Sequence, residues 1–290
     1  MDLARNWKDY EIIDASNGQK LERWKNIYLL RPDPQIIWDN GNLEKKYKGM
    51  IDAVYHRSKS GGGYWENIKN VKPRWTVNYK NLTFNIKQMG FKHTGLFPEQ
   101  AFNWDFMIDK ISKSGRKIKV LNLFAYTGGA TVACLSANAS VTHVDSSRGM
   151  VDWCKENVDS CGYRDREIRY IVDDVLKFVK REIRRGNKYD AIIMDPPSYG
   201  RGSNKEVWSI EKNLFELVSL CTEILSDDPL FFLINSYTTG LSSTVLKNLL
   251  TITVEKKYSG KISCGEVGLP ITKGNLVLPC GIYGRWEKND

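Results

Sequence analysis

The stretch from Lys117 to Gly200 constrains the fold more than any other part of the chain. It holds four short apolar runs typical of buried strands, at residues 117–124, 141–144, 168–172 and 189–194. Segments with helical periodicity separate these runs. This alternation predicts a doubly wound, parallel α/β sheet. Polar or glycine-containing residues follow each run, at the edge where open α/β sheets bind ligands.

The first run passes directly into a turn of small residues, Ala125 to Gly129. Such a turn lets the backbone approach a ligand closely. The dinucleotide fingerprint Gly-x-Gly-x-x-Gly is missing, because Phe124 and Tyr126 occupy its first two glycine positions. The chain also has no phosphate-binding loop of the form Gly-x-x-x-x-Gly-Lys-Ser/Thr. The turn therefore suits a nucleoside-type ligand without a phosphate at this point.

The next three runs end on carboxylates. Asp145 follows the second run, Asp173 and Asp174 follow the third, and Asp195-Pro196-Pro197-Ser198-Tyr199 follows the fourth. A carboxylate at this edge can accept hydrogen bonds from a ribose diol. Asp145 and Asp174 could equally cap the helices that follow them.

The order of these segments resembles class I S-adenosylmethionine-dependent methyltransferases. The segments are Asn122–Gly129, Asp145, Asp174–Val175 and Asp195–Tyr199. Residues 124–129 and 195–199 are similar to the bacterial 23S rRNA methyltransferases that make 5-methylcytosine or 7-methylguanine. The resemblance covers roughly residues 90 to 290. It implies a Rossmann-like sheet and S-adenosylmethionine as the cofactor.

The resemblance also implies which residues contact the cofactor. The turn after the first run would pack against the methionine part, Asp145 and Ser146 would hold the ribose, and Asp174 and Val175 would contact the adenine. The segment from Thr94 to Gln100 resembles one that lies against the cofactor in these enzymes, although it ends in Glu99-Gln100-Ala101 where the family often has Asp-Gln-Arg. The expected set is Thr94, Phe97, Gln100, Asn122, Phe124, Ala125, Tyr126, Thr127, Gly128, Asp145, Ser146, Asp174, Val175 and Asp195.

The predicted catalytic residues are Asp195, Pro196, Pro197, Ser198 and Tyr199. The two prolines stiffen the turn, and its carbonyl groups together with Asp195 would bind and orient an amine. Relatives that methylate amines carry an aromatic residue directly after Pro-Pro. This chain has Ser198 there, so Tyr199 is the expected stacking residue.

The alternative chemistry, methylation of cytosine at C5, needs a cysteine that adds to C6. Relatives place this cysteine after the Pro-Pro turn or after the fifth strand. Those places hold Ser198 and Tyr237-Thr238-Thr239 here. A hydroxyl with no histidine beside it is a poor nucleophile. The sequence therefore favours a nitrogen acceptor.

Residues 1–88 are expected to form a small β-rich domain, and residues 89–290 the methyltransferase domain. The clearest feature of the first is the alternation over Trp75–Ile86, which predicts a hairpin. Six of the nine tryptophans precede residue 105. They could stack on bases, but core packing is the favoured interpretation. The domain would contact RNA or a sister subunit in a homodimer.

Composition limits the partners and the location. The net charge of +9 favours a polyanion such as RNA. No apolar run approaches the ~20 residues of a membrane span, and the start lacks the apolar core of a signal peptide. Six scattered cysteines without metal-ligand spacing indicate reduced thiols in a cytoplasmic protein that binds no metal.

Together these observations predict an S-adenosylmethionine-dependent methyltransferase that acts on a base nitrogen of RNA, most naturally ribosomal RNA. Two alternatives stay open. The acceptor could be a small molecule or a protein side chain, or the chain could be a non-catalytic cofactor-binding protein that docks on RNA. An intact Asp195-Pro196-Pro197 argues against the second alternative.

Overall fold

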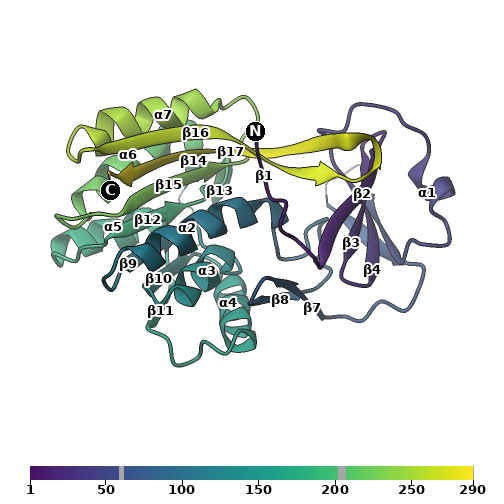
Figure 1. Ribbon diagram of the computed structural model, residues 1–290, viewed down its shortest axis with the longest axis horizontal. Helices are drawn as coiled ribbons and strands as arrows, with labels where there is room; N and C mark the ends of the chain where they lie inside the picture. The colour runs from purple at the N-terminus through teal and green to yellow at the C-terminus, as the bar shows by residue number, and fades with distance from the viewer. Residues whose placement is uncertain (59–61, 202–206, 290) are drawn as a thin grey trace. The chain divides into compact units, whose positions relative to one another are not determined.

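The computed structural model describes residues 1–58, 62–201 and 207–289, and they form two compact units (Figure 1). The first unit comprises residues 1–2, 103–267 and 280–290, and the second comprises residues 3–102 and 268–279. The predicted boundary between residues 88 and 89 falls inside the second unit. The division into domains 1–88 and 89–290 therefore stays a prediction.

The first unit contains a sheet in which five parallel strands are followed by antiparallel ones. Its order is β11-β10-β9-β12-β15-β17-β16. β17 runs antiparallel to β15. The first parallel strand in sequence, β9, therefore lies in the middle of the order. The chain adds β10 and β11 on one side of it and then β12 and β15 on the other, which confirms the predicted doubly wound fold. The strands are β9 (Lys119–Leu123), β10 (Ser140–Asp145), β11 (Ile168–Val172), β12 (Ala191–Met194), β15 (Phe231–Ser236), β16 (Gly260–Ile271) and β17 (Leu276–Lys288).

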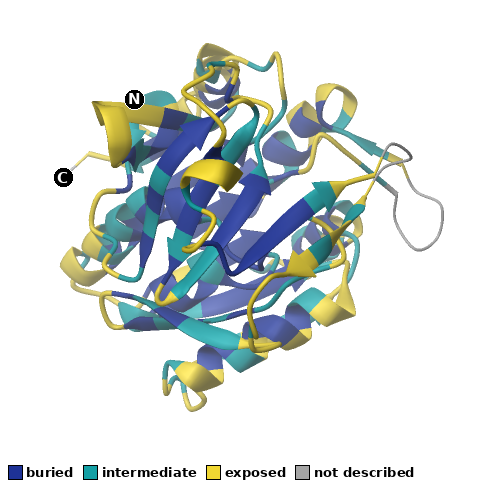
Figure 2. Cartoon of the chain, turned by 90° about the vertical axis from the view of Figure 1, so that its right-hand side faces the viewer, coloured by how far each residue is buried: buried dark blue, intermediate teal, exposed yellow. Residues whose placement is uncertain are grey.

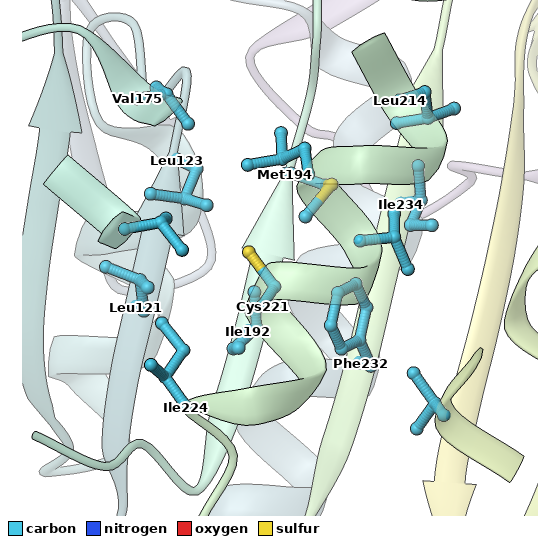
Figure 3. Packing of buried hydrophobic residues seen from close by; sticks show 14 of the residues in the cluster. Leu121, Leu123, Val175, Ile192, Met194, Leu214, Cys221, Ile224, Phe232 and Ile234 are labelled. Atoms are coloured by element: carbon cyan, nitrogen blue, oxygen red, sulfur yellow. The ribbon is translucent and has the colours of Figure 1, made fainter. Parts of the chain in front are cut away.

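Helices cover both faces of this sheet (Figure 1). One face packs against α5 (Val175–Arg184), α6 (Ile210–Glu223) and α7 (Ser243–Leu250), and Figure 3 shows side chains of strands and helices meeting there. The other face carries α2 (Ala101–Lys113), α3 (Gly129–Ser136) and α4 (Arg148–Ser160). Leu121, Ile192 and Phe232 each have 0% exposure. Strands buried on both faces need continuous apolar runs, and this is why the runs were recognisable in the sequence.

The second unit is rich in strands, as predicted. Its sheet has the order β2-β3-β4-β5-β6, and a separate hairpin joins β7 to β8. Figure 2 shows these strands as a mixture of buried and half-buried residues, and many of the loop residues as exposed. The elements are β2 (Tyr10–Ser16), β3 (Gln19–Trp24), β4 (Ile27–Pro32), α1 (Leu43–Lys46), β5 (Ala53–Arg57), β6 (Gly63–Asn67), β7 (Trp75–Tyr79), β8 (Leu82–Ile86) and the 3-10 turn η1 (Pro98–Gln100).

The tryptophans of the second unit serve packing. Trp24 has 0% exposure. The indole N–H groups of Trp7, Trp38 and Trp65 donate to the backbone carbonyls of Pro98, Ala15 and Met89. These bonds satisfy the polar edge of each of the three half-buried indoles. The favoured interpretation of these residues, core packing, agrees with these contacts.

A buried ion pair joins neighbouring strands of the second unit. Glu22 on β3 is 0% exposed and Arg31 on β4 is 6% exposed. Arg31 Nε donates to Glu22 Oε2 at 2.5 Å, and Nη2 donates to Oε1 at 2.8 Å. The Tyr10 hydroxyl adds a third hydrogen bond to Oε1 at 2.6 Å. Although burial alone would raise it, the pKa of Glu22 is lowered to about 2 because Arg31 and Lys20 favour the charged form.

Buried hydrogen bonds connect β9 and β10 of the first unit to α3. Asn122 Nδ2 donates to Thr131 Oγ1 at 2.9 Å, and this hydroxyl lies 2.9 Å from Nδ1 of His143. His143 is 0% exposed. Burial lowers the pKa of His143 to about 3, so the imidazole is neutral at neutral pH.

Breaking the buried ion pair on one side should destabilise the protein strongly. Arg31→Met leaves the Glu22 carboxylate buried without its main partner, and we expect a loss of about 3–5 kcal/mol in the free energy of urea unfolding. Adding Glu22→Leu should recover at least half of this loss. The matched control is Arg23→Met, which removes a partly exposed partner of Glu11 and should cost less than about 1 kcal/mol. Equal losses in the single and double variants would contradict the account.

The neutral His143 should make the protein sensitive to mild acid. Its folded pKa lies below the ordinary value of 6.5, so only the unfolded chain binds a proton as the pH falls below about 6.5. The contribution of His143 to the unfolding free energy is therefore fully present above about pH 6.5 and decreases as the pH falls towards 3. Between pH 7 and pH 5 this histidine alone should remove about 2 kcal/mol of unfolding free energy. In urea titrations, the unfolding free energy of the His143→Asn variant should therefore fall by about 2 kcal/mol less between pH 7 and pH 5 than that of the wild type. The same fall in both proteins would refute the assignment.

Candidate active site

The register of the parallel strands brings the predicted turns to one edge of the sheet. Leu123, the last residue of β9, pairs with Val144 on β10 and with Met194 on β12. The residues that follow these positions therefore leave the sheet at the same level. β10 lies on one side of β9 and β12 on the other, so the chain reverses its direction of winding at β9. Ligands bind in the crevice that such a switch point opens.

The turn after β9, residues 124–128, has an unusual backbone. Phe124 and Tyr126 have φ values of 53° and 52°, a region that bulky residues seldom adopt. Gly128 has a φ of 85°, and a Cβ atom there would lie 2.2 Å from Cys154 Sγ. Glycine is therefore required at position 128, because a side chain would strain the backbone and collide with α4.

Neighbouring elements hold this turn in place. Ala125 N–H donates to the Val144 carbonyl at 3.1 Å. Asn157 of α4 is 0% exposed, and its Nδ2 donates to the Thr127 carbonyl at 2.8 Å. The sequence-based prediction missed Asn157. The sequence feature that could have indicated Asn157 is a polar residue on the same helix face as the apolar residues Cys154 and Val158.

Asp145 stands at the end of β10 as a half-buried carboxylate. Its Oδ2 accepts from Tyr126 N–H and its Oδ1 from Ser147 N–H, both at 2.9 Å. It has no basic partner within the described ranges, and burial raises its pKa. Each oxygen keeps a second lone pair for a further donor. Ser146 lies beside Asp145 and is exposed.

The structure shows Asp174 in the helix-capping role. Its Oδ1 accepts from Lys177 N–H at 2.9 Å at the start of α5. Its other oxygen, Oδ2, has no hydrogen-bond partner in the part of the chain that the structure describes. Val175 is buried, and the neighbouring Asp173 pairs with Arg181. Capping uses one oxygen and leaves the other available, so contact with an adenine amine stays a prediction.

Four other predicted cofactor residues lie away from the strand ends or in the second unit. Asn122 is inside β9, where its amide is bonded to Thr131. Thr94, Phe97 and Gln100 belong to the second unit. The Thr94 hydroxyl is buried and has no hydrogen-bond partner in the described part of the chain, so a ligand or a water molecule would satisfy it. For all four residues, contact with the cofactor stays a prediction.

The turn after β12 contains the predicted catalytic residues. Asp195 N–H donates to the Leu123 carbonyl at 3.4 Å, so the turn begins beside the end of β9. Pro196 is buried, while Pro197, Ser198 and Tyr199 are exposed. Ser198 Oγ lies 2.7 Å from Thr238 Oγ1, which links this turn to the segment after β15.

Three of the six cysteines are poorly suited to act as nucleophiles. Cys134, Cys154 and Cys221 are fully buried, and burial raises the pKa of each thiol above its ordinary value. All six cysteines are free thiols. Across the described residues, no group of three or more His, Cys, Asp or Glu side chains is arranged to hold a metal ion. No helix in those residues is long and apolar enough to cross a membrane.

Solved structures share this fold. The crystal structure of the SAM-dependent methyltransferase from Agrobacterium tumefaciens is 31% identical, with a TM-score of 0.93 over 99% of this chain and 93% of that one. SMU.776, a protein crystallised with SAH, is 18% identical with a TM-score of 0.73 over 97% of this chain and 76% of that one. The second comparison shows likeness of fold alone.

Among curated proteins, ribosomal RNA large subunit methyltransferase K of Neisseria meningitidis is 28% identical over 85% of this chain and 70% of its own length. The K/L enzyme of Shewanella frigidimarina is 28% identical over 58% of this chain and 23% of its own length. The chain thus spans about a quarter of the K/L relatives. The family described as S-adenosylmethionine-dependent methyltransferase matches residues 50–234. With the strand order and the two adjacent turns, this match places the chain in the S-adenosylmethionine-dependent methyltransferase family.

Proposed function

We propose that this enzyme transfers a methyl group from S-adenosylmethionine to a base nitrogen of RNA, most naturally ribosomal RNA. The observation that carries the proposal is the position of the Asp195–Tyr199 turn directly beside the Phe124–Gly128 turn. The two turns follow neighbouring strands, β12 and β9, at the switch point of the sheet. A donor site and an acceptor site at that point lie close enough for direct transfer.

The residues at the strand ends fit the cofactor. Asp145 is a carboxylate without a basic partner in the described ranges, and its four acceptor positions are only half used. A ribose diol supplies the two donors that it lacks. The left-handed turn residues Phe124 and Tyr126 bring backbone groups to the same edge for the methionine part. When bound, S-adenosylmethionine supplies an electrophilic methyl group.

The acceptor turn offers hydrogen-bond acceptors and no cysteine thiolate. Asp195 supplies a carboxylate, and the Pro196 carbonyl has no hydrogen-bond partner in the described part of the chain. Both groups can accept hydrogen bonds from an amine or ring N–H and stabilise the positive charge that develops on the nitrogen. Catalysis then consists of positioning and electrostatic stabilisation. Tyr199 is 56% exposed and offers a face for stacking on the base.

Methylation of cytosine at C5 finds no support at this edge. The two places that would hold its cysteine carry Ser198 and Thr238, whose hydroxyl groups are engaged with each other. The nearest thiol to the cofactor turn, Cys154, is buried behind Gly128 and has a raised pKa. A thiol that is hard to ionise is a poor nucleophile.

Two observations support RNA as the acceptor. The curated relatives are named as ribosomal RNA methyltransferases. The net charge is +9, which favours a polyanionic partner. The proposal includes a cytoplasmic location, supported by six free cysteines. An RNA or subunit contact through residues 1–88, including a homodimer, is also part of the proposal.

Removing the charge of Asp145 should weaken cofactor binding. Asp145→Asn keeps the shape of the side chain but replaces a charged acceptor, so we expect the Kd for S-adenosylhomocysteine to rise about 10- to 100-fold in calorimetry. The matched control is Asp152→Asn, an exposed aspartate on α4 that pairs with Lys155. Its Kd should stay within about twofold. An unchanged Kd for Asp145→Asn would exclude the ribose-binding role.

The acceptor can be identified by labelling. The protein is incubated with methyl-labelled S-adenosylmethionine and unmodified total RNA, and the RNA is then digested to nucleosides. We expect label on a base nitrogen, and a loss of at least about 100-fold in rate for Asp195→Ala because the orienting carboxylate is gone. Label at cytosine C5 would refute the nitrogen chemistry. Binding of cofactor without any labelled RNA would exclude RNA as the acceptor.

A further inference from the structure

A short hairpin follows the acceptor turn and brings Trp208 back to it. The hairpin consists of β13 (Tyr199–Arg201) and β14 (Val207–Ser209), with Trp208 paired opposite Gly200. Trp208 is partly buried. Nothing in the function proposed above uses it.

The indole of Trp208 is bonded to the acceptor turn. Its Nε1–H donates to the Pro197 carbonyl at 2.6 Å, and Ile210 N–H donates to the next carbonyl, Ser198, at 3.1 Å. Prolines have no N–H, so a Pro-Pro turn can be anchored only through its carbonyls and its flanking residues. Trp208 therefore sets the orientation of the peptide group between Pro197 and Ser198. The neighbouring Pro196 carbonyl has no hydrogen-bond partner in the described part of the chain, and the proposed function assigns it to the substrate.

The same indole contacts the cofactor turn. Its ring centroid lies 5.0 Å from that of Phe124, and the two ring planes are inclined by 58°. Phe124 has a φ of 53°, which is unfavourable for a bulky residue and persists only when its surroundings hold it. A tilted aromatic pair at this distance is an attractive contact. One side chain thus touches the turn on the donor side and the turn on the acceptor side.

We propose that Trp208 is a positioning residue that fixes the separation of the methyl-donor turn and the acceptor turn. It acts through the Pro197 carbonyl on one side and the Phe124 ring on the other. Transfer between two bound groups depends steeply on their alignment, so loosening either contact should slow the reaction. The inference rests on the proposed function in assigning the Asp195–Tyr199 turn to the acceptor.

Two substitutions separate the two contacts. Trp208→Phe keeps a ring near Phe124 and removes the N–H, so kcat for RNA methylation should fall about tenfold, as expected for one lost hydrogen bond. The Kd for S-adenosylhomocysteine should stay within about twofold. Trp208→Leu also removes the ring, so that Kd should rise by about threefold or more. The matched control is Trp38→Phe, which deletes a comparable N–H donated to the Ala15 carbonyl in the other unit and should change neither quantity.

A spectroscopic measurement tests the inference without turnover. In protein labelled with 5-fluorotryptophan, the fluorine resonance absent from Trp208→Phe belongs to Trp208. This resonance should shift when S-adenosylhomocysteine is added, because the ring lies against the cofactor turn. An unshifted resonance or an unchanged kcat in Trp208→Phe would overturn the positioning role. So would a Trp208→Phe variant in which kcat, cofactor affinity and melting temperature all fall together. If wild-type protein labels no RNA, the proposed substrate fails, while the resonance and the Kd of Trp208→Leu still decide the role of Trp208.

Discussion

The site depends on one constraint, the parallel pairing of β9 with β10 on one side and with β12 on the other. Because Leu123 is in register with Val144 and with Met194, three loops leave the sheet at the same level. The helices that follow β9 and β12 lie on opposite faces, so the chain leaves these two strands in different directions, as at the switch points where open α/β sheets bind ligands. The predicted site residues that directly follow these strands are placed by this pairing.

A second constraint acts on the loop after β9. Its backbone passes through left-handed conformations at Phe124, Tyr126 and Gly128, which would be unfavourable in isolation. The surrounding structure holds it from several directions. Asp145 accepts from Tyr126, Asn157 donates to Thr127, and Cys154 packs where a side chain at Gly128 would stand. The cofactor would therefore meet a turn that is already formed, and little ordering would be needed on binding.

The acceptor loop is built on a different principle. Two prolines remove two N–H donors, so the loop is held by Asp195 N–H, by the hydroxyl pair of Ser198 and Thr238, and by Trp208. Under the proposed function, this loop presents the Asp195 carboxylate and the Pro196 carbonyl to the substrate. Such a set would stabilise a nitrogen that becomes positive, and it includes no cysteine thiol that could add to cytosine C6.

The sequence by itself determined the fold class, the cofactor and the places of the two turns. Buried parallel strands must be continuously apolar, and the residues that follow them must be small or polar, so both leave a local signal over residues 117–200. The hairpin that the sequence predicted over Trp75–Ile86 was also confirmed. The alternation of apolar and polar residues that predicted it lies within one short segment. Only the tertiary structure revealed Asn157, His143 and Trp208, each of which supports a turn or strand distant in sequence. It also showed that Asp174 caps α5 and that Asn122 of β9 bonds to Thr131 of α3. These facts depend on which side chains packing brings together across the fold, and no periodicity along one segment records such contacts.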